Sequence, residues 1–342
     1  MQTNTSIYPK HARRSLCAAV ILAVVTLLVQ SLSSCNKGTS HEPCHIVPLY
    51  SYLMRSIDSS DEQLRALDDS LHRAISDFFA FEGIDTVTPY AMRWWAQTPP
   101  ARVFSPDVDS IYADLSGLER SLGEIIGNAS DHGLDLPRRR YAAIVIGKPG
   151  TTMFATDSTF CIALNHYLGE NYRGYMGFDA YQRVTKTPAM LPYDIAEALV
   201  ALRYHAPDSC RHDNVASRLL REGALIEAKM RLVSDADAAH ALGYLPEQYE
   251  WLEQHEAELW RAMVCRKLVY STNPRIISSL FAPGPFTREL SEYTPGRAGR
   301  YIGYKIVKAY LKSHPEATLL DVLTPAFYAD AAKVIGEADY QP

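Results

Sequence analysis

The sequence predicts a mostly helical α+β fold with a small β-sheet or hairpin in the middle of the chain. Apolar residues recur at helical spacing in both flanking parts. Between them, short apolar runs bounded by turn residues lie between residues 141 and 164. The chain has 342 residues, of which 47% are hydrophobic and 21% charged, a globular composition. Its net charge of −5 argues against a nucleic-acid partner.

The N-terminus has the pattern of an export signal. Three basic residues precede the apolar run 16–29, which is too short to span a bilayer comfortably. The run leads to Leu32-Ser33-Ser34-Cys35, which resembles a bacterial lipobox. We therefore expect residues 1–34 to be a lipoprotein signal peptide and residues 35–47 to contain the lipidated Cys35 and a tether. The alternative is an ordinary signal peptide followed by an unrelated cysteine.

The segment 48–137 is predicted to be a helical lead-in. The apolar run at 46–53, where this segment begins, is expected to be an entry strand or an extended lead-in. Ser59 or Ser60 is placed to cap a first helix that ends near Gly83. Its expected apolar face consists of Leu64, Leu67, Leu71, Ile75 and Phe78. Residues 86–106 contain paired prolines and read as a loop or short helix. Asp107 is placed to cap a second helix that reaches about Gly127.

Strands are expected next. Residues 141–147 form a short apolar run that ends in a Gly-Lys-Pro-Gly turn. Residues 151–155 and 160–164 predict a hairpin around Asp157-Ser158. The Tyr-rich stretch that follows, as far as Pro188, is most simply a surface loop that packs on itself. A binding wall is the alternative interpretation.

Two helices, 192–205 and 219–232, are expected to be buried on most sides. In the first, Ile195, Leu199 and Leu202 have core-facing spacing, yet Glu197 lies in the same run. A buried carboxylate is costly without a partner. Glu197 is therefore either exposed to solvent at the side of the helix or part of a functional site.

The C-terminal part is expected to be helical over 247–270, 302–314 and 319–335, with a loop at 283–285. His255-Glu256 begins like a zinc-binding H-E-x-x-H motif, but Leu259 occupies the fifth position, so the pair reads as solvated surface. No motif places a catalytic triad, a phosphate loop or a dinucleotide site, and we expect no cofactor.

The cysteines after Cys35 have no metal-binding or redox spacing. Cys161 and Cys265 lie in apolar runs and read as small core residues. Cys44 and Cys210 flank expected loops and are candidates for a disulfide, although four cysteines allow three connectivities.

Several segments together resemble the gliding-motility lipoprotein GldB family of Bacteroidota. They are the lipobox, IALNHYLG, DIAEAL, REGALIEA, GYLPEQYEWLEQHEAELW and TPGRAGRYIGYKIVKAYL. The resemblance implies a single GldB-like domain over 48–342. It also implies a lipoprotein of the outer membrane, on its periplasmic face, associated with gliding motility and the type IX secretion machinery. Its partners would be the membrane, through Cys35, and other envelope proteins.

The part from 138 to 342 is also similar in layout to zincin metallopeptidases, a fold-level analogy. A zincin helix needs two histidines four residues apart around a glutamate. Aligned on Glu197, those positions are Ala196 and Val200, which cannot bind a metal through their side chains. This favours a non-catalytic interaction protein on a degenerate metallopeptidase fold. A hydrolase or a peptide- or glycan-binding protein with an unusual site is the alternative.

We therefore expect a former active-site groove lined by five residues. Glu197 and Glu222 form its floor, and Arg297, Arg300 and Tyr301 begin a later helix and pair with these carboxylates. A purely structural salt-bridge network is the competing interpretation.

Overall fold

A four-stranded mixed sheet with the order β1-β2-β4-β3 lies in the N-terminal half of the computed structural model, which describes residues 41–205 and 214–342. Strand β1 (Ile46–Pro48) runs parallel to β2 (Arg140–Ile144), and β2 runs parallel to β4 (Thr159–Ala163). Strand β3 (Met153–Ala155) pairs antiparallel with β4, as the predicted hairpin requires. The signal peptide, Cys35 and Cys210 lie outside the described residues.

The central strands are buried on both faces, because every residue of β4 and four of the five in β2 are buried. This agrees with the continuous apolar runs in the sequence. The β3–β4 turn is held by Asp77, whose Oδ2 accepts hydrogen bonds from Thr156, Ser158 and Thr159 at 2.8, 2.7 and 2.6 Å. These hydrogen bonds help to lower the pKa of Asp77 against the opposing effect of burial.

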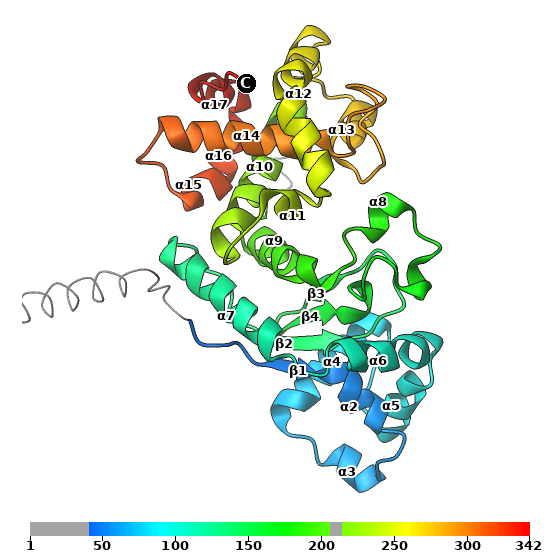
Figure 1. The fold of residues 1–342 in the computed structure, drawn as a ribbon. Helices are drawn as coiled ribbons and strands as arrows, with labels where there is room; N and C mark the ends of the chain where they lie inside the picture. Colours follow the sequence, from blue (N-terminus) through cyan, green and yellow to red (C-terminus); the bar gives the residue numbers. More distant parts are fainter. Residues whose placement is uncertain (1–40, 206–213) are drawn as a thin grey trace, which may run out of the picture. The chain divides into compact units, whose positions relative to one another are not determined.

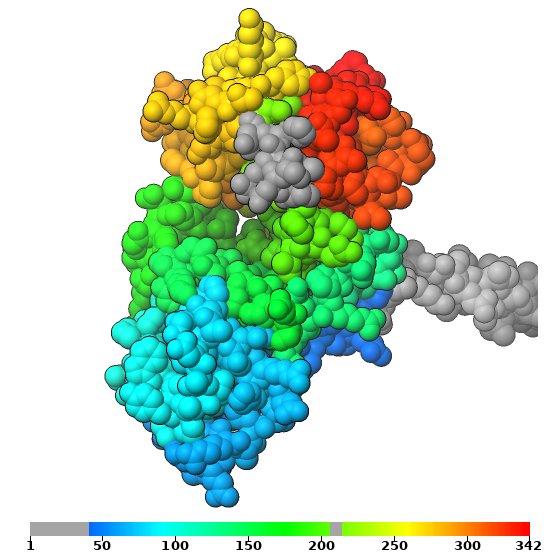
Figure 2. Space-filling view, turned by 180° about the vertical axis from the view of Figure 1, so that it is seen from behind, coloured from blue at the N-terminus to red at the C-terminus, as the bar shows by residue number. Residues whose placement is uncertain are grey.

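The N-terminal helices gather around one end of this sheet (Figure 1). They are α2 (Leu49–Arg55), α3 (Asp61–Arg65), α4 (Asp69–Glu82), α5 (Pro89–Ala96) and α6 (Pro99–Ile111), whereas α7 (Ser116–Asp131) lies apart from them and contacts α9 (Figure 1). The helices that follow α9 in the chain lie on the side of α9 that faces away from the sheet (Figures 1 and 2). None of the described helices is long and apolar enough to cross a membrane.

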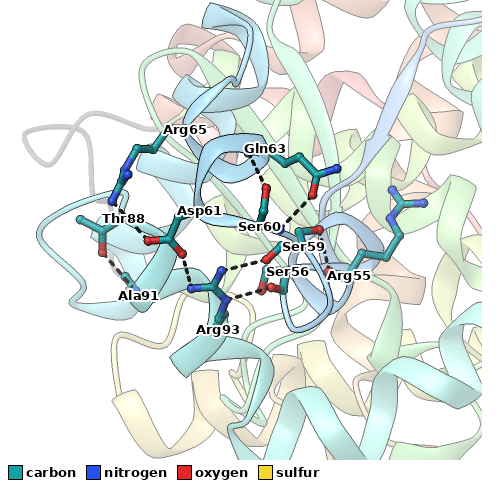
Figure 3. Close-up of polar contacts among 10 residues, drawn as sticks. All are labelled: Arg55, Ser56, Ser59, Ser60, Asp61, Gln63, Arg65, Thr88, Ala91 and Arg93. Carbon is teal, nitrogen blue, oxygen red and sulfur yellow. Dashed lines mark hydrogen bonds and ion pairs between the residues drawn. The ribbon is translucent and has the colours of Figure 1, made fainter.

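Helices α2, α3 and α5 are joined by one arginine (Figure 3). Arg93 donates to the carbonyl oxygens of Ser56 and Ser59 at 3.2 and 2.8 Å and pairs with Asp61 at 2.7 Å. Ser60 forms the expected cap, with Gln63 completing a capping box. Gly83 ends α4 in the left-handed conformation, as predicted.

Four predictions in this region are wrong. The run expected to be extended over 46–53 is a strand only as far as Pro48, because α2 begins at Leu49. The first helix is two helices, because the side chain of Asp68 caps a new one through the N–H of Leu71. Asp107 caps nothing, since it lies inside α6, which starts at the proline pair after Thr98 and accommodates Pro106. Helix α7 continues past Gly127 to Asp131.

The middle and C-terminal parts are helical. Their elements are η1 (Leu164–His166), η2 (Arg173–Tyr175), α8 (Ala180–Arg183), η3 (Pro188–Met190), α9 (Leu191–Arg203), α10 (Val215–Leu232), α11 (Ala238–Leu242), α12 (Pro246–Cys265), α13 (Pro274–Phe281), α14 (Ala298–Ser313), α15 (Leu319–Leu323), α16 (Pro325–Ala329) and α17 (Ala331–Glu337). The helix expected over 319–335 is therefore three short ones, divided at Pro325 and Asp330.

The cysteines are partly as predicted. Cys161 is a buried core residue, whereas Cys265 is exposed at the end of α12, so its assignment to the core is wrong. Cys44 is a free thiol at the edge of the core. The proposed partner Cys210 falls in the part of the chain that is not described.

Candidate functional site

The site is built around α9, the helix predicted from Pro192 onward. Pro192 lies in its first turn, where a missing N–H costs no hydrogen bond. The positions that would carry zinc ligands, Ala196 and Val200, are completely buried among apolar side chains. Glu197 faces away from that core, with 26% of its side chain exposed.

Glu197 is held by two cations from two other helices. Arg300 on α14 donates from Nη2 to Oε1 at 2.6 Å, and Lys229 on α10 pairs with Oε2. Lys229 also donates to the carbonyl of Ala241 at 2.8 Å. Burial alone would raise the pKa of Glu197, but Arg300 and Lys229 outweigh it and hold that pKa well below its ordinary value. Glu197 is therefore ionised.

Glu222 is the second carboxylate that Arg300 contacts. The Arg300 Nε lies 3.1 Å from its Oε2, an ion pair without hydrogen-bond geometry. Arg218, one turn earlier on α10, pairs with Oε1 at 2.9 Å. The predicted pairing of Glu197 and Glu222 with an arginine of the later helix is confirmed for Arg300.

The close contact of α10 and α14 brings these charges together. A Cβ on Gly223 would lie 2.2 Å from the carbonyl oxygen of Gly303, and one on Gly303 would lie 2.1 Å from that of Leu219. Only glycines allow the two backbones to approach this closely. Since Gly223 follows Glu222 and Gly303 lies three residues after Arg300, the crossing positions both charged side chains.

Asp194 lies one turn before Glu197, and its pKa is shifted in the opposite direction. It accepts a hydrogen bond from Tyr167 Oη at 2.8 Å. Burial raises its pKa against the lowering effect of Lys229, and the ionised Glu197 adds to the rise. Two carboxylates whose pKa values are pushed apart are typical of acid–base sites, although ion-pair networks also produce them.

Two of the predicted groove residues do not pair with these carboxylates. Arg297 precedes α14 with a φ of 62°, and its Nη2 donates to the carbonyl of Gly243 at 3.0 Å. Tyr301 follows Arg300 directly and therefore points to another side of α14, where it donates to Glu256 at 2.8 Å. For Tyr301 the predicted pairing is wrong, because adjacent helical residues point about 100° apart.

Glu256 was also wrongly predicted to be solvated surface. Only 13% of its side chain is exposed, and it accepts from Tyr340 Oη at 2.9 Å as well as from Tyr301. Lys305 pairs with it at 2.9 Å. Its neighbour His255 stacks on Trp251 at 4.0 Å. Glu256 therefore fastens the C-terminal segment to α12 and α14.

The residues of α9 do not fit a zinc ion, because the two ligand positions hold an alanine and a valine. Within residues 41–205 and 214–342, no three or more His, Cys, Asp or Glu side chains are grouped to hold a metal. The described contacts of the site are ion pairs between helices, and one carboxylate, Asp194, has its pKa raised toward the protonated form.

The fold and the site define a mostly helical α+β protein with a network of ion pairs between three helices. Its sequence places it more closely: the chain belongs to the GldB family, since the model described as gliding motility protein GldB matches residues 40–342. No curated protein and no solved structure gives a match.

Proposed function

We propose that this protein is a lipid-anchored factor of the outer membrane that acts without catalysis in the gliding-motility and type IX secretion-associated envelope machinery. The observation that carries the proposal is the match to the GldB family over residues 40–342. The lipobox at Leu32 to Cys35 supports the anchor, and the polar segment after it is suited to a tether.

The core of the fold supports the non-catalytic part of the proposal. A degenerate metallopeptidase would keep the helix and lose the ligands, which agrees with Ala196 and Val200. Glu197 would have been the base for a metal-bound water in such an enzyme. Here it forms ion pairs with Arg300 and Lys229. An ionised carboxylate bound to two cations is a poor base, because accepting a proton would break both pairs.

The anchor is tested by replacing Cys35 with Ser in cells. We expect the wild-type protein to incorporate labelled palmitate and to sediment with the outer membrane. Cys35→Ser should lose the label and leave that fraction. Ser34→Thr, which changes a neighbour and keeps the cysteine, is the control for processing. Retention of Cys35→Ser in the outer membrane without label would contradict the anchor.

The assembly role is tested by crosslinking in cells and by gliding or secretion assays. We expect the wild-type protein to crosslink to other envelope proteins and its deletion to impair their assembly. Glu197→Gln in a stably folded protein should leave function intact if the network is structural.

A hydrolase is the second candidate, favoured by the opposite pKa shifts of Asp194 and Glu197. It predicts that Glu197→Gln and Asp194→Asn each abolish a measurable hydrolysis while the melting temperature stays near that of the wild type. An active Glu197→Gln variant would exclude a catalytic role for Glu197.

A further inference from the structure

A second polar site lies beside the ion-pair network. Arg297 is one of the predicted groove residues, and Phe178 to Lys186 belong to the Tyr-rich stretch for which a binding wall is the alternative interpretation. It is a pocket of about 200 Å³ between the α8 segment, the start of α12 and the loop before α14. Lys186 and Arg297 both line it. It therefore presents two cations in a space large enough for a small chemical group.

Neither of these cations has a carboxylate in ion-pair contact within the described residues, in contrast to Lys229 and Arg300. Lys186 is 91% buried, given its 9% exposure, and its Nζ contacts His166 Nδ1 at 3.4 Å. Its other close neighbours are the rings of Tyr175 and Phe178, at 5.2 and 4.7 Å from Nζ. Among the residues that the structure describes, the Arg297 guanidinium donates a hydrogen bond only to the carbonyl oxygen of Gly243.

The pKa shifts of Lys186 and Arg297 are those expected of buried cations that lack an ion-pair partner. Burial lowers the pKa of Lys186, and burial together with the nearby Arg300 lowers the pKa of Arg297. Asp194 acts on both in the opposite direction without contacting either. A bound anion would relieve the desolvation cost of both cations, since buried charges are stable only when paired.

Two amide donors complete the lining. The Oε1 atoms of Gln182 and Gln248 accept hydrogen bonds from the backbone N–H groups of Asp179 and Leu245, at 3.1 and 3.0 Å. Because an N–H group can only meet an acceptor, these bonds fix the orientation of both amides. The NH₂ groups of two pocket-lining residues thus remain as donors, which suits an oxyanion.

An apolar hollow of about 460 Å³ adjoins the pocket and shares Tyr181, Val184 and Gln248 with it. Its remaining wall includes Leu245, Pro285 and the half-exposed Phe286. We propose that the two hollows together bind a small organic carboxylate, with the carboxylate between Lys186 and Arg297 and an apolar tail along the adjoining hollow. The site stands apart from the proposed assembly role.

The test is isothermal titration calorimetry on the purified mature chain with three probes: octanoate, the dipeptide leucyl-phenylalanine and its C-terminal amide. We expect saturable binding of at least one carboxylate. The amide should bind about tenfold more weakly than the free dipeptide, since a charge-assisted hydrogen bond contributes about that factor. Binding of octanoate alone would identify a fatty acid as the ligand, and binding of the dipeptide a peptide C-terminus.

Lys186→Met and Arg297→Gln should each weaken binding about tenfold or more, whereas Lys312→Met, an exposed lysine on α14, should not. Lys186→Met should also keep or raise the melting temperature, because it removes a buried cation that lacks a carboxylate partner. Equal binding of the amide and the free acid, or no saturable binding of any probe, would overturn the proposal. So would unchanged binding by both variants.

Discussion

Replacing Arg300 with Met tests the network most directly. Arg300 is 8% exposed and serves both Glu197 and Glu222. Removing one partner of a buried ion pair costs about 3 to 5 kcal/mol, because a charge is left uncompensated. Here each carboxylate keeps one other cation, so we expect the lower end, about 3 kcal/mol. For a unit of this size that corresponds to a fall of roughly 6 °C in melting temperature.

Arg218→Met is the matched control, since Arg218 pairs with the same Glu222 but has 47% of its side chain exposed. An exposed pair contributes about 1 kcal/mol or less. The assay is thermal and urea unfolding followed by circular dichroism at pH 7. If Arg300→Met is no less stable than Arg218→Met, the network does not hold the three helices together, and the reasoning fails. Adding Glu222→Gln to Arg300→Met should restore part of the loss.

The pH dependence of the same variant gives an independent check. The pKa of Glu197 is lowered in the folded protein, so its stabilising contribution is present above the ordinary value of 4.5 and is lost as the pH falls through the folded pKa. Arg300→Met should therefore flatten the acid limb of the stability profile. An acid limb identical to that of the wild type would show that Arg300 is not what keeps Glu197 ionised.

Three further predictions concern other parts of the fold. Gly303→Ala should destabilise the protein by roughly 2 kcal/mol or more in urea unfolding, because the new Cβ meets the carbonyl of Leu219. The control Gly336→Ala, with open space around it in α17, should be neutral or stabilising. Burial and the nearby lysine lower the pKa of His166 from 6.5 to about 4. The free energy of unfolding should therefore be highest above pH 6.5 and fall by roughly 3 kcal/mol toward pH 4, because the unfolded chain binds a proton at this histidine before the folded protein does. His166→Leu should remove this dependence. Glu256→Gln should cost about 1 to 3 kcal/mol and loosen the C-terminal segment, measured by hydrogen exchange; unchanged protection there would contradict its fastening role.

Local pattern was enough to predict much of the architecture. The apolar spacing of α9, α10 and α12, the β3–β4 hairpin, the helix start at Ser60 and the helix end at Gly83 depend on residues near in sequence. They could therefore be inferred without a fold. The pairing of Arg300 with Glu197 and Glu222 was also predicted, because buried carboxylates require cations. The match to the GldB family likewise rests on sequence alone.

Tertiary contacts decided the rest. Position 123 inside α7 needs a glycine because a Cβ there would lie 2.2 Å from the carbonyl oxygen of Glu42, a close approach that no local pattern reveals. Arg300 faces Glu197 while Tyr301 faces Glu256, since the rotation of α14 is set by its crossing with α10 at Gly303. The ion pair of Lys229 with Glu197 was not predicted, because it also depends on how the helices pack. Sequence determined which charges had to be paired, and only the packing of the helices determined their partners.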